Sequence, residues 1–355
     1  LKAIRELLPK SATNPFPILV GTSAGAVNAV VLATHARNFA VGVEGLLEVW
    51  RNFHAEQVYR ADPVGIAATA IRWLGALTFG WLTHRSPYSL LDNSPLRRLL
   101  NRYVNLLRID DAISHEALRA ISITCSGYNS GESVSFFQGC ADIEPWRRSQ
   151  RVGTHAKIEL DHLMASSAIP FVFPAVKLHR EYFGDGSMRQ LAPISPAIHL
   201  GAEKILVIAA GRKAEEHDRP DKPGYPSLAK VAGHALSSIF LDSLWMDLER
   251  MTRINQTLSM IPEEERQQNG TPLRPIEVLV ISPSQRLDHL AAKHAYALPW
   301  PVRALLRGIG AMNPDSGALV SYLLFEPPYT HALIELGYGD TMARKDEVRG
   351  FLSKG

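Results

Sequence analysis

The feature that most constrains this chain is a serine set between two glycines in residues 21–25, Gly-Thr-Ser-Ala-Gly. The apolar run 16–20 precedes this pentapeptide and the small-residue run 26–33 follows it, which predicts a strand, a tight turn and a helix. A serine on such a turn projects its hydroxyl outward, and the next helix directs free N–H groups toward an oxyanion formed there. We therefore predict that Ser23 is a nucleophile; a turn with only a packing role is the alternative.

The neighbours of Ser23 fit a nucleophile turn because they are small. Gly21 and Gly25 are expected to let backbone segments approach closely, and Ala24 adds little bulk beside Thr22. These four residues form the predicted nucleophile elbow.

The composition limits the class of protein. The 355 residues, 46% hydrophobic and 21% charged, fit a soluble globular enzyme with a substantial core. A net charge of +3 argues against nucleic acid as the main partner. The two cysteines, Cys125 and Cys140, have no metal-ligand spacing and are expected to be reduced thiols. We predict no metal site and no cofactor.

Strands and helices alternate along the chain, which predicts one α/β sandwich. An Asn-Ser-Pro start predicts a helix from residue 93, and alternating residues on both sides of a turn at 129–131 predict a hairpin. The runs 204–210 and 276–281 are typical of fully buried strands. Further expected helices are 1–8, 24–36, 41–53, 158–168 and a long one ending near 261; a polar loop is expected at 212–226.

Two apolar segments raise the question of membrane contact. Residues 62–82 are long enough to span a membrane, but Arg72 and three glycines disfavour that interpretation. A core or lid helix and an interfacial helix that meets lipid remain as alternatives. Residues 300–307 mix aromatic, aliphatic and basic side chains, so they predict either an interfacial helix or an ordinary amphipathic helix packed on the domain.

A serine nucleophile needs a base. Among the histidines, His179, His199 and His331 do not follow a buried strand in the order expected of an α/β-hydrolase. Asp185 stands between Gly184 and Gly186 after a short apolar piece, and is the better candidate. The alternative is a tight Asp-Gly turn without catalytic function.

With these blocks in order, the chain resembles the patatin-like phospholipases. Gly21–Gly25 matches the family's nucleophile block, and residues 165–176 match its middle block with Ala175 in place of the second proline. Asp185-Gly186 matches the dyad block, with Ser187 third; Ala192-Pro193 keeps only part of the Asn-x-Pro that follows in the family.

The resemblance implies a patatin-like three-layer α/β/α sandwich with a mainly parallel central sheet and a helical C-terminal elaboration. Residues 1–210 are the expected catalytic core, and 211–355 are expected to continue the same domain. The implied activity is hydrolysis of (phospho)lipid esters through a dyad of Ser23 and Asp185, at a cytoplasmic or peripheral membrane location.

The resemblance also implies an oxyanion hole. The N–H of Ala24 is one expected donor. The family's Gly-rich loop supplies the remainder, and we expect that loop to lie N-terminal to Leu1, so that the sequence given is a fragment of a complete enzyme.

Two other functions stay open from the sequence. An acyltransferase of the malonyl-transferase type shares the serine elbow, but Thr22 stands where its histidine would be. A non-catalytic scaffold or regulator with the same fold is the second alternative.

Overall fold

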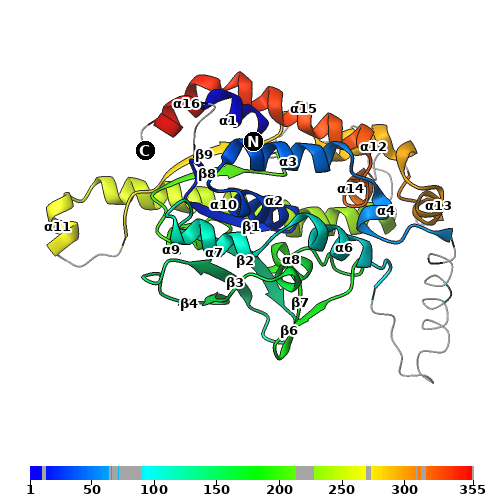
Figure 1. Ribbon diagram of the computed structural model, residues 1–355, viewed down its shortest axis with the longest axis horizontal. Helices are drawn as coiled ribbons and strands as arrows, with labels where there is room; N and C mark the ends of the chain where they lie inside the picture. The colour runs from blue at the N-terminus through cyan, green and yellow to red at the C-terminus, as the bar shows by residue number, and fades with distance from the viewer. Residues whose placement is uncertain are drawn as a thin grey trace.

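The architecture is a central sheet with helices on both faces (Figure 1). The computed structural model describes residues 1–9, 13–63, 65, 71, 89–212, 228–268, 273–308, 310–312 and 317–353. The expected three-layer α/β class is confirmed. The predictions for residues 62–82 and 212–226 fall almost entirely outside the described residues.

The main sheet is mixed and has, within the described residues, the order β4-β5-β3-β2-β7-β6, with β1 also paired to β2. The pairs β1–β2 and β3–β5 are parallel, whereas β2–β3, β2–β7, β4–β5 and β6–β7 are antiparallel. The β2–β3 pair is the predicted hairpin. The strands are β1 (Ile18–Thr22), β2 (Ala120–Gly127), β3 (Ser133–Gly139), β4 (Trp146–Arg148), β5 (Arg151–His155), β6 (Val176–Leu178) and β7 (Glu181–Asp185).

The helices expected at 1–8, 24–36, 41–53 and 158–168 are observed with ends shifted by at most two residues, and further helices are present that the sequence did not predict. The helices of the first 200 residues are α1 (Lys2–Leu7), α2 (Ala24–Thr34), α3 (Phe39–Arg51), α4 (Ala55–Val58), α6 (Ser94–Tyr103), α7 (Leu107–Ser114), α8 (Leu160–Ser166) and α9 (Ser195–His199), with the 3-10 helix η1 (Gly186–Arg189). The later ones are α10 (Leu228–Ser259), α11 (Glu263–Gln268), α12 (Leu287–His294), η3 (Ala295–Ala297), α13 (Trp300–Gly308), α14 (Gly317–Ser321), α15 (Pro327–Ala343) and α16 (Lys345–Ser353).

The two faces of β2 differ in chemistry because successive side chains of a strand point to opposite faces. Ile121, Ile123 and Cys125 are fully buried in the main core, on the face that α2 and α8 cover. Ser122 and Thr124 alternate with them and are also fully buried. One face of this strand is therefore apolar and the other is lined by hydroxyl groups.

A second sheet consists of the parallel pair β8 (Lys204–Ile208) and β9 (Glu277–Ile281). Leu279 and Ile281 face the main core, while Ile276 and Val278 pack against α10 and α9. The sequence predicts that both strands are fully buried; instead β8 is half-buried and Ile208 is 58% exposed. The apolar residues Ile205 and Val207 of β8 pack against the cluster formed with α10. In the described part of the chain, β8 pairs with another strand on one edge only.

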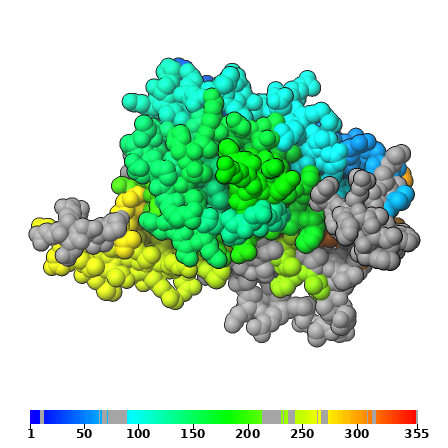
Figure 2. Space-filling model, turned by 90° about the horizontal axis from the view of Figure 1, so that it is seen from below, coloured from blue at the N-terminus to red at the C-terminus, as the bar shows by residue number. Residues whose placement is uncertain are grey.

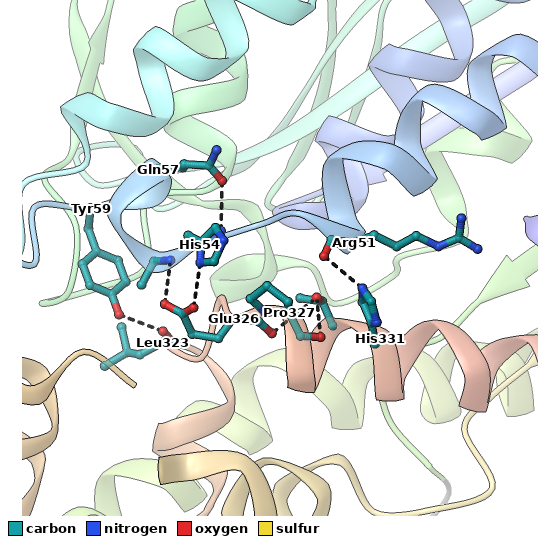
Figure 3. A network of polar contacts seen from close by, with 10 residues as sticks. Arg51, His54, Gln57, Tyr59, Leu323, Glu326, Pro327 and His331 are labelled. Carbon is teal, nitrogen blue, oxygen red and sulfur yellow. Dashed lines mark hydrogen bonds and ion pairs between the residues drawn. The ribbon is translucent and has the colours of Figure 1, made fainter. Parts of the chain in front are cut away.

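The residues beyond 210 pack on the earlier part of the chain. The carboxylate of Glu326, next to α15, accepts hydrogen bonds from His54 Nδ1 at 3.0 Å and from the Ala55 N–H at 3.1 Å (Figure 3). The Tyr59 hydroxyl donates to the Leu323 carbonyl at 2.8 Å. On the face seen from below, the yellow segments lie against the green ones (Figure 2). The Ile194 N–H, just before α9, donates to Asp247 Oδ2 of α10 at 3.1 Å.

Among the residues that the structure describes, no helix is both long and apolar enough to cross a membrane.

Candidate functional site

The candidate site lies where two strands meet on the same edge of β2. β3 occupies one edge of β2 along residues 120–126. On the other edge β1 runs parallel to residues 120–124, and β7 runs antiparallel to residues 125–127. The two strands therefore approach each other with their C-terminal ends, Thr22 beside Thr124 and Asp185 beside Cys125. This arrangement brings Ser23 and Asp185 together although they are far apart in sequence.

Ser23 occupies a strained turn between β1 and α2. Its backbone has φ 54° and ψ −128°, a conformation that non-glycine residues rarely adopt. A Cβ on Gly21 would overlap the backbone of Gly25 and Ala26, so the first glycine of the elbow is required. A Cβ on Gly25 would meet nothing within 4 Å, so the prediction that both glycines permit close approach is wrong for the second one.

Ser166 links the turn at Ser23 to β2 through two hydrogen bonds. The Ser23 N–H donates to Ser166 Oγ at 3.0 Å, and Ser166 Oγ–H donates to the Thr124 carbonyl at 2.7 Å. Ser166 is the last residue of α8 and is fully buried. Ser166 belongs to the middle block of residues 165–176, but the sequence predicts no function for it.

Asp185 is the last residue of β7 and is fully buried. It leads directly into η1, and its N–H donates to the Ala168 carbonyl at 2.9 Å. Its Oδ1 atom accepts a hydrogen bond from the Ser187 N–H at 3.0 Å. These contacts fix the carboxyl group beside the end of β1.

Burial raises the pKa of Asp185 from 3.8 to about 6. Hydrogen bonding by the Ser23 hydroxyl and by Ser187 opposes part of this rise in pKa. Within the described part of the chain, Oδ2 has no hydrogen-bond partner. Catalytic hydrogen bonds are often long in the absence of substrate.

The glycines on either side of Asp185 allow close packing around it. A Cβ on Gly186 would overlap the Thr124 carbonyl and lie 2.9 Å from Thr22 Cγ2, and a Cβ on Gly184 would lie 2.5 Å from the Tyr128 hydroxyl. The missing side chains therefore allow β7 and η1 to pack against β1, β2 and the Tyr128 ring.

The first turn of α2 offers backbone donors next to Ser23. The Ala26 N–H bonds back to the Ser23 carbonyl at 2.9 Å, and the N–H groups of Ala24 and Gly25 precede the first bond of the helix. Both residues are exposed. An anion bound beside Ser23 would meet these N–H groups and the positive end of the helix.

Three apolar residues of the middle block, 171–173, differ in exposure. Val172 and Phe173 are buried in the main core, where the Phe173 ring lies 6.2 Å from that of Tyr59. Phe171 has φ 65° and is 75% exposed. Only Phe171 is therefore free to meet a substrate.

The structure places the three histidines considered from the sequence outside this site. His199 ends α9 and stacks on Trp146. His331 bonds to the Arg51 carbonyl at 3.0 Å, and His179 lies in the turn between β6 and β7. Within the described ranges, no group of three or more His, Cys, Asp or Glu side chains is arranged to hold a metal ion.

The described part of the chain is therefore a three-layer α/β sandwich in which a strand–serine–helix turn lies beside the end of a strand that carries a buried carboxyl group. Residues 1–198 match the family described as patatin-like phospholipase. The match covers more than half of the 355 residues, and the chain belongs to this family of lipid acyl hydrolases. A search of curated proteins found no matching relative.

Proposed function

We propose that this protein hydrolyses carboxylic esters of lipids, with Ser23 as the nucleophile and Asp185 as the base. The observation that carries the proposal is the meeting of β1 and β7 on one edge of β2, which sets the two residues side by side. A base is most effective when its pKa lies near the working pH. With a pKa of about 6, Asp185 is a stronger base than an ordinary aspartate and is still ionised at neutral pH.

In the first half of the reaction, Ser23 Oγ attacks the ester carbonyl carbon while its proton passes to Asp185. The negative charge that forms on the carbonyl oxygen is stabilised by the Ala24 N–H and by the end of α2. The tetrahedral intermediate then breaks its bond to the alcohol oxygen, which takes the proton from Asp185 and leaves an acyl-enzyme.

In the second half, water attacks the acyl carbonyl carbon and gives a proton to Asp185. The intermediate releases a carboxylic acid, and the proton returns to Ser23 Oγ. No cofactor and no metal ion take part in this scheme. The exposed Phe171 is a candidate contact for the acyl chain.

The test uses the full-length protein and a medium-chain p-nitrophenyl ester. Ser23→Ala and Asp185→Asn should each abolish ester release and labelling by a fluorophosphonate. Ser114→Ala is the matched control, because Ser114 is exposed and bonds only within its own helix and to His115. Activity that survives Ser23→Ala would overturn the assignment, and a wild type that neither reacts with the label nor cleaves esters would favour the scaffold alternative.

We also propose that the protein contacts membranes peripherally through α13. Val302 and Leu306 of this helix are buried, whereas Trp300 is 63% exposed, as is Tyr296 just before it. Exposed aromatic rings of this kind favour the lipid–water interface. Flotation with neutral and anionic liposomes, wild type against Trp300→Ser, tests the proposal, and no binding to either liposome would contradict it.

A further inference from the structure

A pocket lies at the opposite end of β1 from Ser23. Its walls are the segment before β4, the β4–β5 hairpin and the end of α9, and its volume is about 390 Å³. Arg119, which lines it, donates its N–H to the Pro17 carbonyl just before β1 begins. Ser23 follows the other end of the same strand. The pocket is therefore separate from the candidate catalytic site.

Three stacked rings give the pocket a rigid wall. The Phe137 and Trp146 rings lie 5.2 Å apart at 17°, and the Trp146 and His199 rings lie 4.8 Å apart at 14°. The Trp146 ring sits where a side chain on Gly153 would be, so it cannot shift toward the sheet. His199 is the outer ring of the stack and forms part of the pocket lining.

Positive charge is concentrated beside His199. Arg148 and Arg151 are directly paired across the β4–β5 hairpin, so their side chains leave the same face, an arrangement of like charges that is unfavourable on its own. Arg274 reaches the same place, since it donates to the carbonyls of Ile198 and Ala202 at 3.0 and 3.3 Å. Burial first, and then the charges of these three arginines, lower the pKa of His199 to about 4.

The nearby carboxylates do not neutralise this cluster. Asp142 pairs with Arg119 at 2.6 Å, and Glu132 pairs with Arg147 at 2.7 Å. Asp247 lies near Arg151 but pairs with Arg250 at 3.9 Å, and Glu144 lines the pocket. In the part of the chain that the structure describes, no carboxylate forms an ion pair within 4.0 Å with Arg148, Arg151 or Arg274. The electrostatic cost of this arrangement is relieved if an anion enters the pocket.

We infer that the pocket bounded by Trp146, Arg148 and His199 is a binding site for a phosphate group. Guanidinium groups bind phosphate oxygens through paired N–H donors, which makes arginine the common residue for this purpose. A bound dianion would attract a proton to His199, which would then add one more donor. The phosphate can belong to a lipid headgroup or to a soluble compound. The inference does not rest on the proposed hydrolysis, because its test measures binding.

The first experiment titrates the full chain with inorganic phosphate at constant ionic strength and follows the imidazole signal of His199 by NMR. Wild type should show saturable binding and a His199 pKa that rises by at least one unit in phosphate. Arg148→Gln/Arg151→Gln should weaken binding at least tenfold. Arg98→Gln/Arg102→Gln on α6 removes the same charge from exposed positions and should bind as wild type. If the double variant does not fold, Arg148→Gln alone replaces it in the test, because Arg148 is exposed.

The second experiment separates the two sources of phosphate. Vesicles of phosphatidylcholine with and without phosphatidic acid are sedimented with wild type and with both double variants. Binding to phosphatidic acid that is lost in Arg148→Gln/Arg151→Gln and competed by inorganic phosphate identifies a lipid headgroup. Phosphate binding without this vesicle binding identifies a soluble phosphate compound. Equal phosphate binding by wild type and the Arg148/Arg151 variant, or no saturable binding by wild type, would overturn the inference.

Discussion

Ser166 holds the backbone of Ser23 and the carbonyl of β2 at the same time, through hydrogen bonds of 3.0 Å from the Ser23 N–H and 2.7 Å to Thr124. Ser166→Ala leaves both buried groups without their partner, which typically costs about 1–3 kcal/mol of the free energy of unfolding. Because the lost bond orients the strained elbow, kcat should fall at least tenfold while KM stays within about twofold. Steady-state ester kinetics and urea unfolding of the variant measure both effects.

Ser122→Ala is the matched control for Ser166→Ala. Ser122 is also a fully buried serine on β2, but its hydroxyl has no partner among the described residues. Its removal should leave kcat unchanged and change the free energy of unfolding by less than about 1 kcal/mol. A Ser166→Ala enzyme with the kcat of wild type would show that Ser166 is only a packing residue.

The pH dependence of hydrolysis should follow Asp185. Burial raises the pKa of this carboxyl group to about 6, and the proposed base is active only when ionised. The value of kcat/KM should therefore be constant above about pH 7 and fall tenfold per pH unit well below pH 6. A profile that stays flat to pH 4.5 on a substrate with a pH-independent readout would exclude Asp185 as the base.

Asp185 should also make the folded protein less stable at neutral pH. Its pKa is about 6 when folded and near 3.8 when unfolded, so between these values the folded state binds more protons and the free energy of unfolding falls as pH rises. The full cost of the buried charge is thus present above pH 6 and absent below about pH 4. Asp185→Asn should raise the free energy of unfolding at pH 8 by about 2–3 kcal/mol.

The control for Asp185→Asn is the pH at which the comparison is made. The gain over wild type should shrink toward zero at pH 4, where both side chains are uncharged. An Asp185→Asn variant that is no more stable than wild type at pH 8 would contradict the buried-charge account of this residue.

The two glycines of the elbow should respond differently to alanine. A Cβ at Gly21 overlaps the backbone of Gly25 and Ala26, so Gly21→Ala should lower the free energy of unfolding by more than about 2 kcal/mol and abolish hydrolysis. Gly25→Ala meets open space and replaces glycine by a better helix former in the first turn of α2. Thermal unfolding should find Gly25→Ala as stable as wild type or up to about 1 kcal/mol more stable.

Gly25→Ala can still reduce activity, because the new methyl group would stand beside the exposed N–H groups near Ser23. Stability and activity are therefore measured separately. Equal destabilisation by both substitutions would contradict the packing described here.

The local features of the site were predictable from sequence, but its assembly was not. Strand, turn and helix around Ser23 follow from apolar runs and small residues, and both elements are observed within a few residues of the expected bounds. The burial of Asp185 was not predictable, because Asp-Gly is also the signature of a turn and only the pairing with Cys125 places it in a strand. Periodicity says nothing about which strands share an edge of β2.

Three further features were not predictable, because sequence patterns do not show which distant segments become neighbours. The bond from Ser23 to Ser166 joins residues 143 positions apart, and a short serine-containing block gives no sign of its partner. The half-buried β8 is as apolar in sequence as a strand covered on both faces. The sequence alone therefore does not show that β8 is only half-buried. The basic pocket depends on a hairpin register that pairs Arg148 with Arg151.

The contact of Glu326 with α4 should contribute to the stability of the whole chain. Glu326 is mostly buried, 13% exposed, and accepts from both His54 Nδ1 and the Ala55 N–H (Figure 3). Glu326→Ala should lower the free energy of unfolding by about 1–3 kcal/mol, because the Ala55 N–H loses its acceptor. Glu326→Gln keeps an acceptor oxygen and should lose less than half as much. The His54 ion pair adds little, since that ring is half exposed.

Glu335→Ala is the matched control for Glu326→Ala. Glu335 lies within α15, the helix that Glu326 precedes, but its carboxylate is 64% exposed and its ion pair with Lys2 is at the surface, so its loss should cost less than about 1 kcal/mol. If residues 211–355 continue the domain formed by 1–210, Glu326→Ala will shift one cooperative unfolding transition seen alike by tryptophan fluorescence and circular dichroism. Two separate transitions, with only the later segment affected by Glu326→Ala, would show instead that the C-terminal part folds as an independent unit.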